Sequence, residues 1–246
     1  MIVNTKNLAR KIIFVVIFLA AVIGFGIFAK NAVNKENQIS SMKAAQAASE
    51  QQEKKSDIAG SDLSKAQEGD IVLGDQFAPV TMIEYASLSC PHCASFYSEA
   101  FSSVKTEYID TKKVKFIYRD FPLNQPALNA AMAAICHYKN TQSAEKYHDF
   151  IRILFRTQES WAFVPDFVHR LASIAKLDGM SEEVFSSCLK DTKLQESILK
   201  SRLDSAKELE IQSTPSFVIN GELVSGFGGL TEIKKILDRK LLESKK

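Results

Sequence analysis

The feature that most constrains this chain is a pair of cysteines two residues apart, in the sequence Cys90-Pro91-His92-Cys93. A strand-like apolar run, Val80–Ala86, ends shortly before this motif, and a helical stretch with apolar residues at every fourth position follows it. Two cysteines at this spacing are typical of a redox-active dithiol where a strand leads into a helix. The same spacing also supplies half of a tetrahedral zinc site.

The residue types of the motif favour redox chemistry. Cys90 would lie at the helix N-terminus, where unpaired N–H groups and the positive end of the helix dipole stabilise a thiolate. Pro91 suits the first helical turn because its missing N–H is not needed there, and a protonated His92 would add positive charge beside the sulfur. Cys93, one turn into the helix, is predicted to be the buried, resolving thiol. This arrangement predicts an α/β, thioredoxin-like fold.

A zinc site is the alternative reading of the motif. A zinc site would need a second closely spaced pair of ligands, but the other two cysteines, Cys136 and Cys188, lie far apart in the sequence. We therefore expect no metal and no cofactor. The charges do not suggest a nucleic-acid partner either, because 31 Lys and Arg residues nearly balance 29 Asp and Glu residues.

The N-terminus resembles an export signal. Basic residues precede an uninterrupted apolar run over residues 12–29, which is the pattern of a segment inserted with its N-terminus inside. Its length lies between a long signal-peptide core and a short membrane span, so a cleaved signal peptide and a retained anchor at residues 1–29 both stay open. Either outcome places the rest of the chain outside the cytoplasmic membrane, and we expect a periplasmic protein.

The remaining chain divides into a linker and one folded domain. Residues 30–69 are rich in Ala, Gln, Ser, Lys and Glu, which predicts a polar linker with little surface to bury. The folded domain is predicted over residues 70–246. Within it, residues from about 124 to 210 read as consecutive amphipathic helices, so we expect an α-helical subdomain inserted into the thioredoxin-like fold, before strand character returns at residue 216.

One acid interrupts the apolar run before the motif. Glu84 lies within Val80–Ala86, six residues before Cys90. An exposed edge position is the plain structural explanation. The functional one is a buried carboxyl beneath the dithiol, whose pKa is raised by desolvation and which accepts the proton of Cys93.

A second element of the site is predicted at Thr214-Pro215, just before the late strand. A proline is tolerated at the first position of a strand. In a thioredoxin fold, however, this position is a cis-proline loop that faces the two cysteines, and a cis bond costs little before proline. Thr214 would then present backbone N–H and C=O groups to an extended polypeptide substrate.

The other two cysteines are expected to form a structural disulfide. Cys136 and Cys188 lie on the apolar faces of helices predicted in the same insertion, and an oxidising compartment permits a bridge. Two separate buried thiols are the alternative, because free cysteine is often buried.

Taken together, these residues resemble the DsbA-like thiol:disulfide oxidoreductases. The resemblance rests on Glu84, the Cys90–Cys93 motif, the long helical insertion and Thr214-Pro215, and it covers residues from about 70 to 242. It implies a dithiol oxidase that acts on unfolded or reduced exported polypeptides and is reoxidised by a DsbB-like membrane protein. Thr214 departs from the best-known members, which carry valine there.

Two other functions remain open from the sequence. A reductase or isomerase of the same fold would use the same motif in the opposite redox direction, and Thr214 also occurs in isomerase-type relatives. A non-catalytic, metal-carrying thioredoxin-like binding module would use the two sulfurs as ligands. The reduction potential of the motif separates the oxidase from the reductase or isomerase. Metal analysis of the purified protein identifies the metal-carrying module.

Overall fold

The computed structural model describes Lys43 and residues 60–245. In this part of the chain, five strands form one mixed sheet in the order β1-β3-β2-β4-β5. The strands are β1 (Val72–Leu73), β2 (Val80–Ala86), β3 (Val114–Asp120), β4 (Ser216–Ile219) and β5 (Glu222–Ser225). Strands β2 and β3 are parallel, whereas the β1–β3, β2–β4 and β4–β5 pairs are antiparallel. The thioredoxin-like fold predicted from the sequence is therefore confirmed.

The central strand β2 is covered on both faces, which explains its nearly continuous apolar sequence. On one face pack the helices that follow the cysteine motif and the terminal helix α9 (Leu230–Glu243). The opposite face is covered by the chain segment that follows helix α8 (Thr192–Glu208). Leu209 and Ile211 of this segment belong to a second apolar cluster. Because β2 and β3 are parallel, their C-terminal ends meet at one edge of the sheet, and the cysteine motif begins at that edge.

The helical run after the motif is continuous but irregular. It consists of α2 (Pro91–Phe96), the π-helical turn η2 (Tyr97–Phe101), α3 (Ser102–Val104) and a second π-helical turn, η3 (Lys105–Ile109). Single π-turns inside helices frequently occur at functional sites. Here the first of them begins four residues after Cys93.

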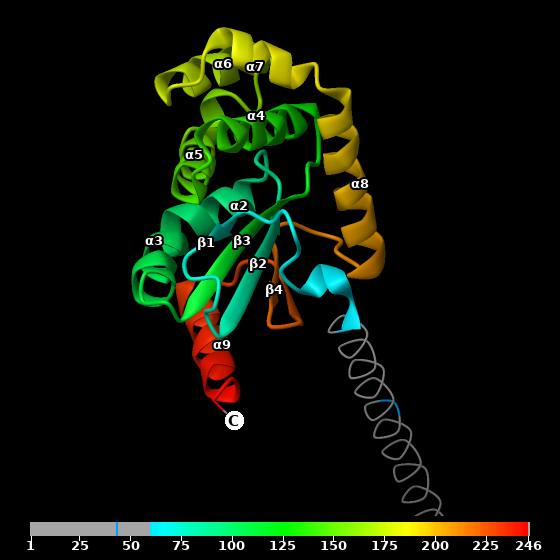
Figure 1. Cartoon of the computed structure of the whole chain (residues 1–246). Coiled ribbons are helices and arrows are strands. Elements are labelled where there is room, and N and C mark those ends of the chain that lie inside the picture. Colours follow the sequence, from blue (N-terminus) through cyan, green and yellow to red (C-terminus); the bar gives the residue numbers. More distant parts are fainter. Residues whose placement is uncertain (1–42, 44–59, 246) are drawn as a thin grey trace, which may run out of the picture. The chain divides into compact units, whose positions relative to one another are not determined.

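The predicted helical insertion is present between β3 and β4 (Figure 1). It consists of α4 (Gln125–Thr141), α5 (Ala144–Arg156), the short η4 (Gln158–Ser160), α6 (Phe167–Leu177), α7 (Glu182–Leu189) and α8. Local sequence defines where several of these helices begin, because side-chain oxygens accept hydrogen bonds from first-turn N–H groups. The capping residues are Asn124, Ser143, Ser181 and Asp191.

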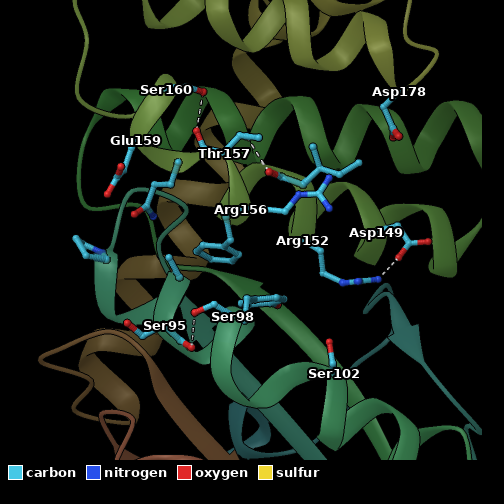
Figure 2. A pocket seen from close by; sticks show the side chains of 16 residues that line it. Ser95, Ser98, Ser102, Asp149, Arg152, Arg156, Thr157, Glu159, Ser160 and Asp178 are labelled. Atoms are coloured by element: carbon cyan, nitrogen blue, oxygen red, sulfur yellow. Dashed lines mark hydrogen bonds and ion pairs between the residues drawn. The ribbon is translucent and has the colours of Figure 1, made fainter.

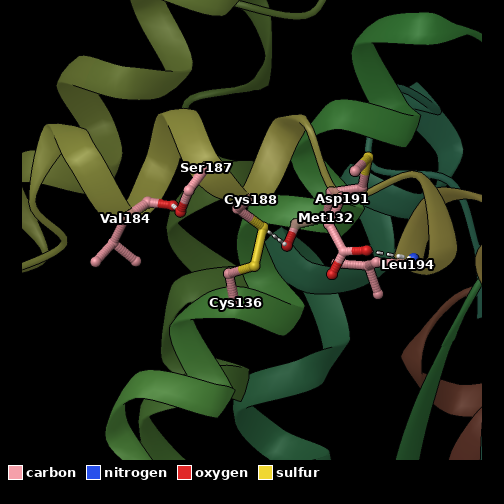
Figure 3. The surroundings of a disulfide bond; sticks show 7 residues. All are labelled: Met132, Cys136, Val184, Ser187, Cys188, Asp191 and Leu194. Atoms are coloured by element: carbon pink, nitrogen blue, oxygen red, sulfur yellow. Dashed lines mark hydrogen bonds between the residues drawn. A yellow bond between two sulfur atoms is a disulfide. The ribbon is translucent and has the colours of Figure 1, made fainter.

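Cys136 of α4 and Cys188 of α7 form a disulfide in this structure (Figure 3). Their Cα atoms are 6.2 Å apart, and the two residues are separated by 52 positions in the chain. The sulfur of Cys188 lies 3.0 Å from the carbonyl oxygen of Met132. This approach is a packing contact, because a disulfide sulfur carries no hydrogen to donate. The bridge ties two helices of the insertion together.

The start of the folded domain differs from the prediction. The composition of residues 60–69 predicts a linker, but in the structure they are anchored to the sheet by Arg119 of β3. The buried guanidinium donates to the carbonyl oxygens of Leu63 at 2.6 Å and Lys65 at 2.7 Å, and it pairs with the carboxylate of Asp70 at 2.7 Å. A buried arginine needs several acceptors at once, and this polar segment supplies two of them.

The predicted export segment at residues 12–29 lies outside the described residues, as does most of the predicted linker. Within residues 60–245, no helix has the length and apolar character that crossing a membrane requires.

Candidate active site

Cys90 lies at the start of helix α2, as the sequence predicts. Its backbone N–H donates to the carbonyl oxygen of Ser87 at 2.9 Å, which closes the turn between β2 and the helix. Cys90 is the N-cap residue in an extended conformation, and Pro91 follows as the first helical residue. Cys90 retains 6% of its exposure, whereas Cys93, one turn further, is 0% exposed. Both cysteines are free thiols in this structure.

The surroundings of Cys90 favour its thiolate. Its pKa is lowered from 9.0 to about 5, chiefly by hydrogen bonding from the Cys93 thiol, against an opposing contribution from burial. The Thr214 side chain and the backbone N–H groups of His92 and Cys93 lower it further. The imidazole of His92 is exposed. The sequence predicts that the ring of His92 stabilises the Cys90 thiolate. In the structure, His92 lowers the pKa of Cys90 through its backbone N–H.

Cys93 has the opposite character. Burial raises its pKa far above the ordinary value, and hydrogen bonding to Cys90 and the charge of Glu84 raise it further. At neutral pH the pair therefore holds one proton, which is located on Cys93, and one negative charge, which is located on Cys90. This asymmetry makes Cys90 the nucleophile and Cys93 the thiol that must gain or lose a proton during exchange.

Glu84 lies inside the protein, beneath the two cysteines, so the exposed edge position considered above is wrong. Its side chain is 0% exposed, and neither carboxyl oxygen has a hydrogen-bond partner among the described residues. Desolvation raises its pKa well above the ordinary value; the Tyr97 hydroxyl opposes this shift and the charge of Cys90 adds to it. A carboxyl whose pKa is raised in this way can give a proton to Cys93 and take it back.

The Thr214–Pro215 bond is cis, and this loop lies against Cys90. The Cys90 sulfur lies 3.3 Å from the carbonyl oxygen of Thr214, to which it can donate a hydrogen bond in its protonated form, so the carbonyl predicted to face substrate lies against the cysteine here. The hydroxyl of Thr214 is buried in the same loop. Gly226 donates to the carbonyl oxygen of Pro215 at 2.8 Å, which ties this loop to the following hairpin.

Gln158 connects the helical insertion to the cysteine motif, which the sequence did not predict. Its buried side-chain amide donates to the carbonyl oxygens of Leu88 at 2.7 Å and Cys90 at 3.1 Å. Both carbonyls belong to the turn that presents Cys90. Since buried carbonyl groups need donors, Gln158 holds the shape of that turn from the insertion.

A cavity of about 1110 Å³ opens beside the motif, between the α2–α3 run and α5 (Figure 2). One wall carries serine side chains, among them Ser98, and the other carries Arg152 and Arg156. Arg152 is paired with Asp149 at 2.8 Å. The cavity extends to Pro91, so it reaches the redox motif from the side of the insertion.

Two further polar groups escaped prediction from the sequence. Tyr97 is buried beside Glu84 and also lines the cavity. Asp120, at the end of β3, has its pKa raised to about 7 by desolvation. Within residues 60–245, no three His, Cys, Asp or Glu side chains come together as ligands for a metal ion.

Comparison with known proteins places this geometry in a family. A family model described as thioredoxin matches residues 65–239. A putative protein-disulfide oxidoreductase of Rickettsia bellii is 31% identical, over 74% of this chain and 68% of that protein. The crystal structure of Wolbachia pipientis alpha-DsbA1 has a TM-score of 0.68 and 31% identity, covering 73% of this chain and 94% of the other. The structure of oxidised BdbD from Bacillus subtilis has a TM-score of 0.64 and 26% identity, covering 72% and 95%.

Proposed function

The chain belongs to the thioredoxin family, among the DsbA-like protein-disulfide oxidoreductases, and on this premise we propose that Cys90 and Cys93 form the redox centre of a dithiol oxidase. The enzyme introduces disulfide bonds into exported proteins. The observation that carries this proposal is the opposite character of the two thiols: the pKa of Cys90 is lowered to about 5, while that of buried Cys93 is raised.

The proposed reaction is two successive thiol–disulfide exchanges. A substrate thiolate attacks the Cys90 sulfur of the oxidised enzyme, forming a mixed disulfide and breaking the Cys90–Cys93 bond. Cys93 leaves as a thiolate and receives a proton from Glu84. The second thiolate of the substrate then attacks the substrate sulfur of the mixed disulfide, and Cys90 leaves as a stabilised thiolate. The substrate dithiol is oxidised by two electrons, and the enzyme disulfide is reduced.

The lowered pKa of Cys90 supports the oxidising direction. With a pKa of about 5, roughly one hundred thiolates exist per thiol at pH 7. Whatever stabilises this thiolate stabilises the reduced enzyme, and a stabilised reduced form makes the oxidised form a stronger oxidant. The low pKa also makes Cys90 a good leaving group when the substrate disulfide closes.

Export to the periplasm belongs to the same proposal. The basic residues and the apolar run at residues 12–29 support export, by a cleaved signal or a retained anchor. The Cys136–Cys188 disulfide is also consistent with an oxidising compartment. Each cycle leaves the enzyme reduced, so it requires reoxidation, for which we propose a DsbB-like membrane protein as the partner.

A second candidate function is disulfide reduction or isomerisation by the same motif. Thr214 favours it, because this residue, which also occurs in isomerase-type relatives, lies directly against the nucleophile. The two functions use the same exchange steps and differ in the reduction potential of the Cys90–Cys93 pair.

The deciding experiment equilibrates the full chain with reduced and oxidised glutathione and measures its reduction potential. The reduction potentials of thioredoxin-fold enzymes span a range from about −120 mV for DsbA to about −270 mV for thioredoxin. We expect a value towards the DsbA end, together with stoichiometric oxidation of a reduced two-cysteine peptide by the oxidised protein. A potential near that of thioredoxin, with no net peptide oxidation, would instead support the reductase.

A further inference from the structure

Glu84 has to exchange protons with solvent during each catalytic cycle of the proposed function. If it protonates Cys93 when the enzyme disulfide opens, it must recover that proton before it can act again. Its carboxyl group is fully buried, however, and has no hydrogen bond among the described residues. A buried acid of this kind needs a polar group that connects it with water.

Tyr97 stands in a position to make that connection. It follows Cys93 by four residues, so both side chains project from the same face of the helical run. Its ring stacks between Phe101, with centroids 4.7 Å apart, and Phe155, at 4.4 Å. The aromatic rings hold the orientation of Tyr97, while its buried hydroxyl has no hydrogen-bond partner among the described residues.

The Tyr97 ring and Glu84 converge on the same part of the core. Phe155, which stacks on Tyr97, also contacts Tyr118, at 6.2 Å between centroids. Tyr118 lies directly beside Glu84 in the parallel β2–β3 pair. Each of the two groups also affects the other: the Tyr97 hydroxyl lowers the pKa of Glu84, and Glu84 raises that of Tyr97. No hydrogen bond joins them in this structure, so a small side-chain movement has to close the contact.

Tyr97 also lines the cavity of about 1110 Å³ beside α2, while its hydroxyl lies just beneath the cavity surface, so the movement that joins it to Glu84 also has to admit a water molecule to it. This cavity is open to solvent and lined by polar side chains, including Ser98, Arg152 and Arg156 (Figure 2). The other titratable groups that influence or flank Glu84 are Cys90 and Cys93 from α2 and Tyr118 from β3. Among these described groups, Tyr97 is the one that also lines the cavity.

We propose that Tyr97 relays protons between Glu84 and the solvent of this cavity. A tyrosine hydroxyl can accept and donate a hydrogen bond at the same time. After Glu84 has given its proton to the Cys93 thiolate, the carboxylate takes the proton of the Tyr97 hydroxyl, which takes one from water in the cavity. In the reverse direction, each proton moves back along the same groups. Tyr97 forms no bond with either sulfur or with substrate in this scheme, so it is a positioning and relay residue.

The test compares Tyr97→Phe with Tyr118→Phe in the full chain. The first change keeps the ring stack and removes only the hydroxyl. The second removes a hydroxyl from the residue beside Glu84 in the sheet, one that bonds the Ala86 carbonyl oxygen at 3.3 Å and does not line this cavity. The measurement is the rate at which a small dithiol reduces the oxidised enzyme, followed by rapid acid quenching and thiol labelling, as a function of pH in water and in heavy water.

We expect Tyr97→Phe to slow this reaction roughly tenfold to a hundredfold. Small buffer acids that can enter the cavity should restore part of the rate, whereas Tyr118→Phe should keep the wild-type pH profile and show no such rescue. Combining Tyr97→Phe with Glu84→Gln should add little to Glu84→Gln alone, because both residues act on one path.

The opposite results have distinct meanings. A Tyr97→Phe rate equal to that of Tyr118→Phe, without buffer rescue, would overturn the relay and leave the exchange chemistry of the proposed function intact. Additive effects in the double variant would likewise contradict a shared path. Failure of the wild-type protein to exchange disulfides at all would instead reject the proposed function, which the relay presupposes.

Discussion

The two cysteine pairs of this domain differ in their chemical state and in their surroundings. Cys90 and Cys93 lie together at the N-terminus of α2, and both are free thiols in the structure. Cys136 and Cys188 are separated by 52 positions and join α4 to α7 as a disulfide. The first pair lies next to a buried acid, Glu84, and the cis-proline loop at Thr214–Pro215. The second pair is packed among the helices of the insertion.

The helix position of each sulfur explains the difference. Cys90 lies at a helix N-terminus, where unpaired N–H groups and the positive end of the dipole favour a thiolate. Cys136 lies within α4, where the backbone N–H groups are used by the helix, and Cys188 is the second-last residue of α7, near the negative end of its dipole. Neither place stabilises a thiolate, so the second pair has little tendency to exchange.

The largest expected effect separates the two cysteines of the first pair. Cys93→Ala should trap mixed disulfides between Cys90 and substrate, because the resolving thiol is gone. Cys90→Ala should trap none and should abolish peptide oxidation, since Cys93 is buried and protonated. Gel analysis after acid quenching measures both outcomes. Equal trapping by the two single variants would show that the asymmetry of the pair does not govern the reaction.

A titration of the reduced protein sharpens the same comparison. Because the pKa of Cys90 is lowered from 9.0 to about 5, the thiolate should form as pH rises through about 5. Between these two values the folded protein binds fewer protons at Cys90 than the unfolded chain does. This group therefore stabilises the reduced fold above pH 9, and the contribution falls as pH decreases and is lost below about 5.

The ultraviolet absorbance of the thiolate measures this titration directly. Reduced wild-type protein should show one acidic transition, and reduced Cys90→Ala should lack it. The oxidised protein serves as a second control, because it has no free thiol to titrate at the motif. A midpoint near the ordinary value of 9.0 would remove the electrostatic basis of the proposed oxidase.

Removing the second pair should affect stability far more than exchange. The variant with both Cys136→Ala and Cys188→Ala loses a bridge worth ~4 kcal/mol in the chain-entropy model for a loop of 52 residues. Its melting temperature should fall by roughly 8–16 °C, while peptide oxidation below the transition stays within about twofold of wild type. Thermal unfolding and oxidation rates measured on one preparation check both statements, with the exposed Ser187→Ala as control. A loss of oxidation comparable with that of Cys90→Ala would show that the two pairs are coupled.

Several features of the molecule could be predicted because local chemistry determines them. The strand before the motif and the capped helices of the insertion follow from residue pattern and spacing. Glu84 could be singled out because a single acid inside an apolar strand is unusual. The cis bond before Pro215 could be expected because a proline at that place has a known geometric use in this fold.

Other features could not be predicted because they depend on distant parts of the chain meeting in space. In the sequence, Tyr97 looks like an ordinary residue on the apolar face of a helix. Only the structure shows that it lies near Glu84 and also lines the cavity. Gln158 lies 68 positions from Cys90, and no local pattern shows that its amide reaches that carbonyl. Residues 60–69 have the composition of a linker, and only the buried guanidinium of Arg119 shows why they are anchored.

The smallest expected effect tests whether the insertion influences the first pair through Gln158. Gln158→Leu keeps a similar volume but leaves the buried carbonyl oxygen of Leu88 without this donor, whereas the carbonyl oxygen of Cys90 keeps its hydrogen bond from the Ala94 N–H at 3.1 Å. An unsatisfied buried carbonyl costs about 1–3 kcal/mol, although part of this cost is relieved if the turn relaxes. We therefore expect a melting temperature lower by a few degrees and an oxidation rate lower by about threefold, since the turn that presents Cys90 is less well held.

The control for this prediction is Gln125→Leu, which removes an exposed side-chain hydrogen bond to Asn129 and should change neither quantity. If Gln158→Leu lowers stability and leaves the oxidation rate unchanged, the amide only supports the fold. The other outcome is a lower oxidation rate below the melting transition, with thiol counting showing that the Cys136–Cys188 disulfide is intact. That result shows that the insertion acts on the redox motif through the Gln158 contact rather than through its own disulfide.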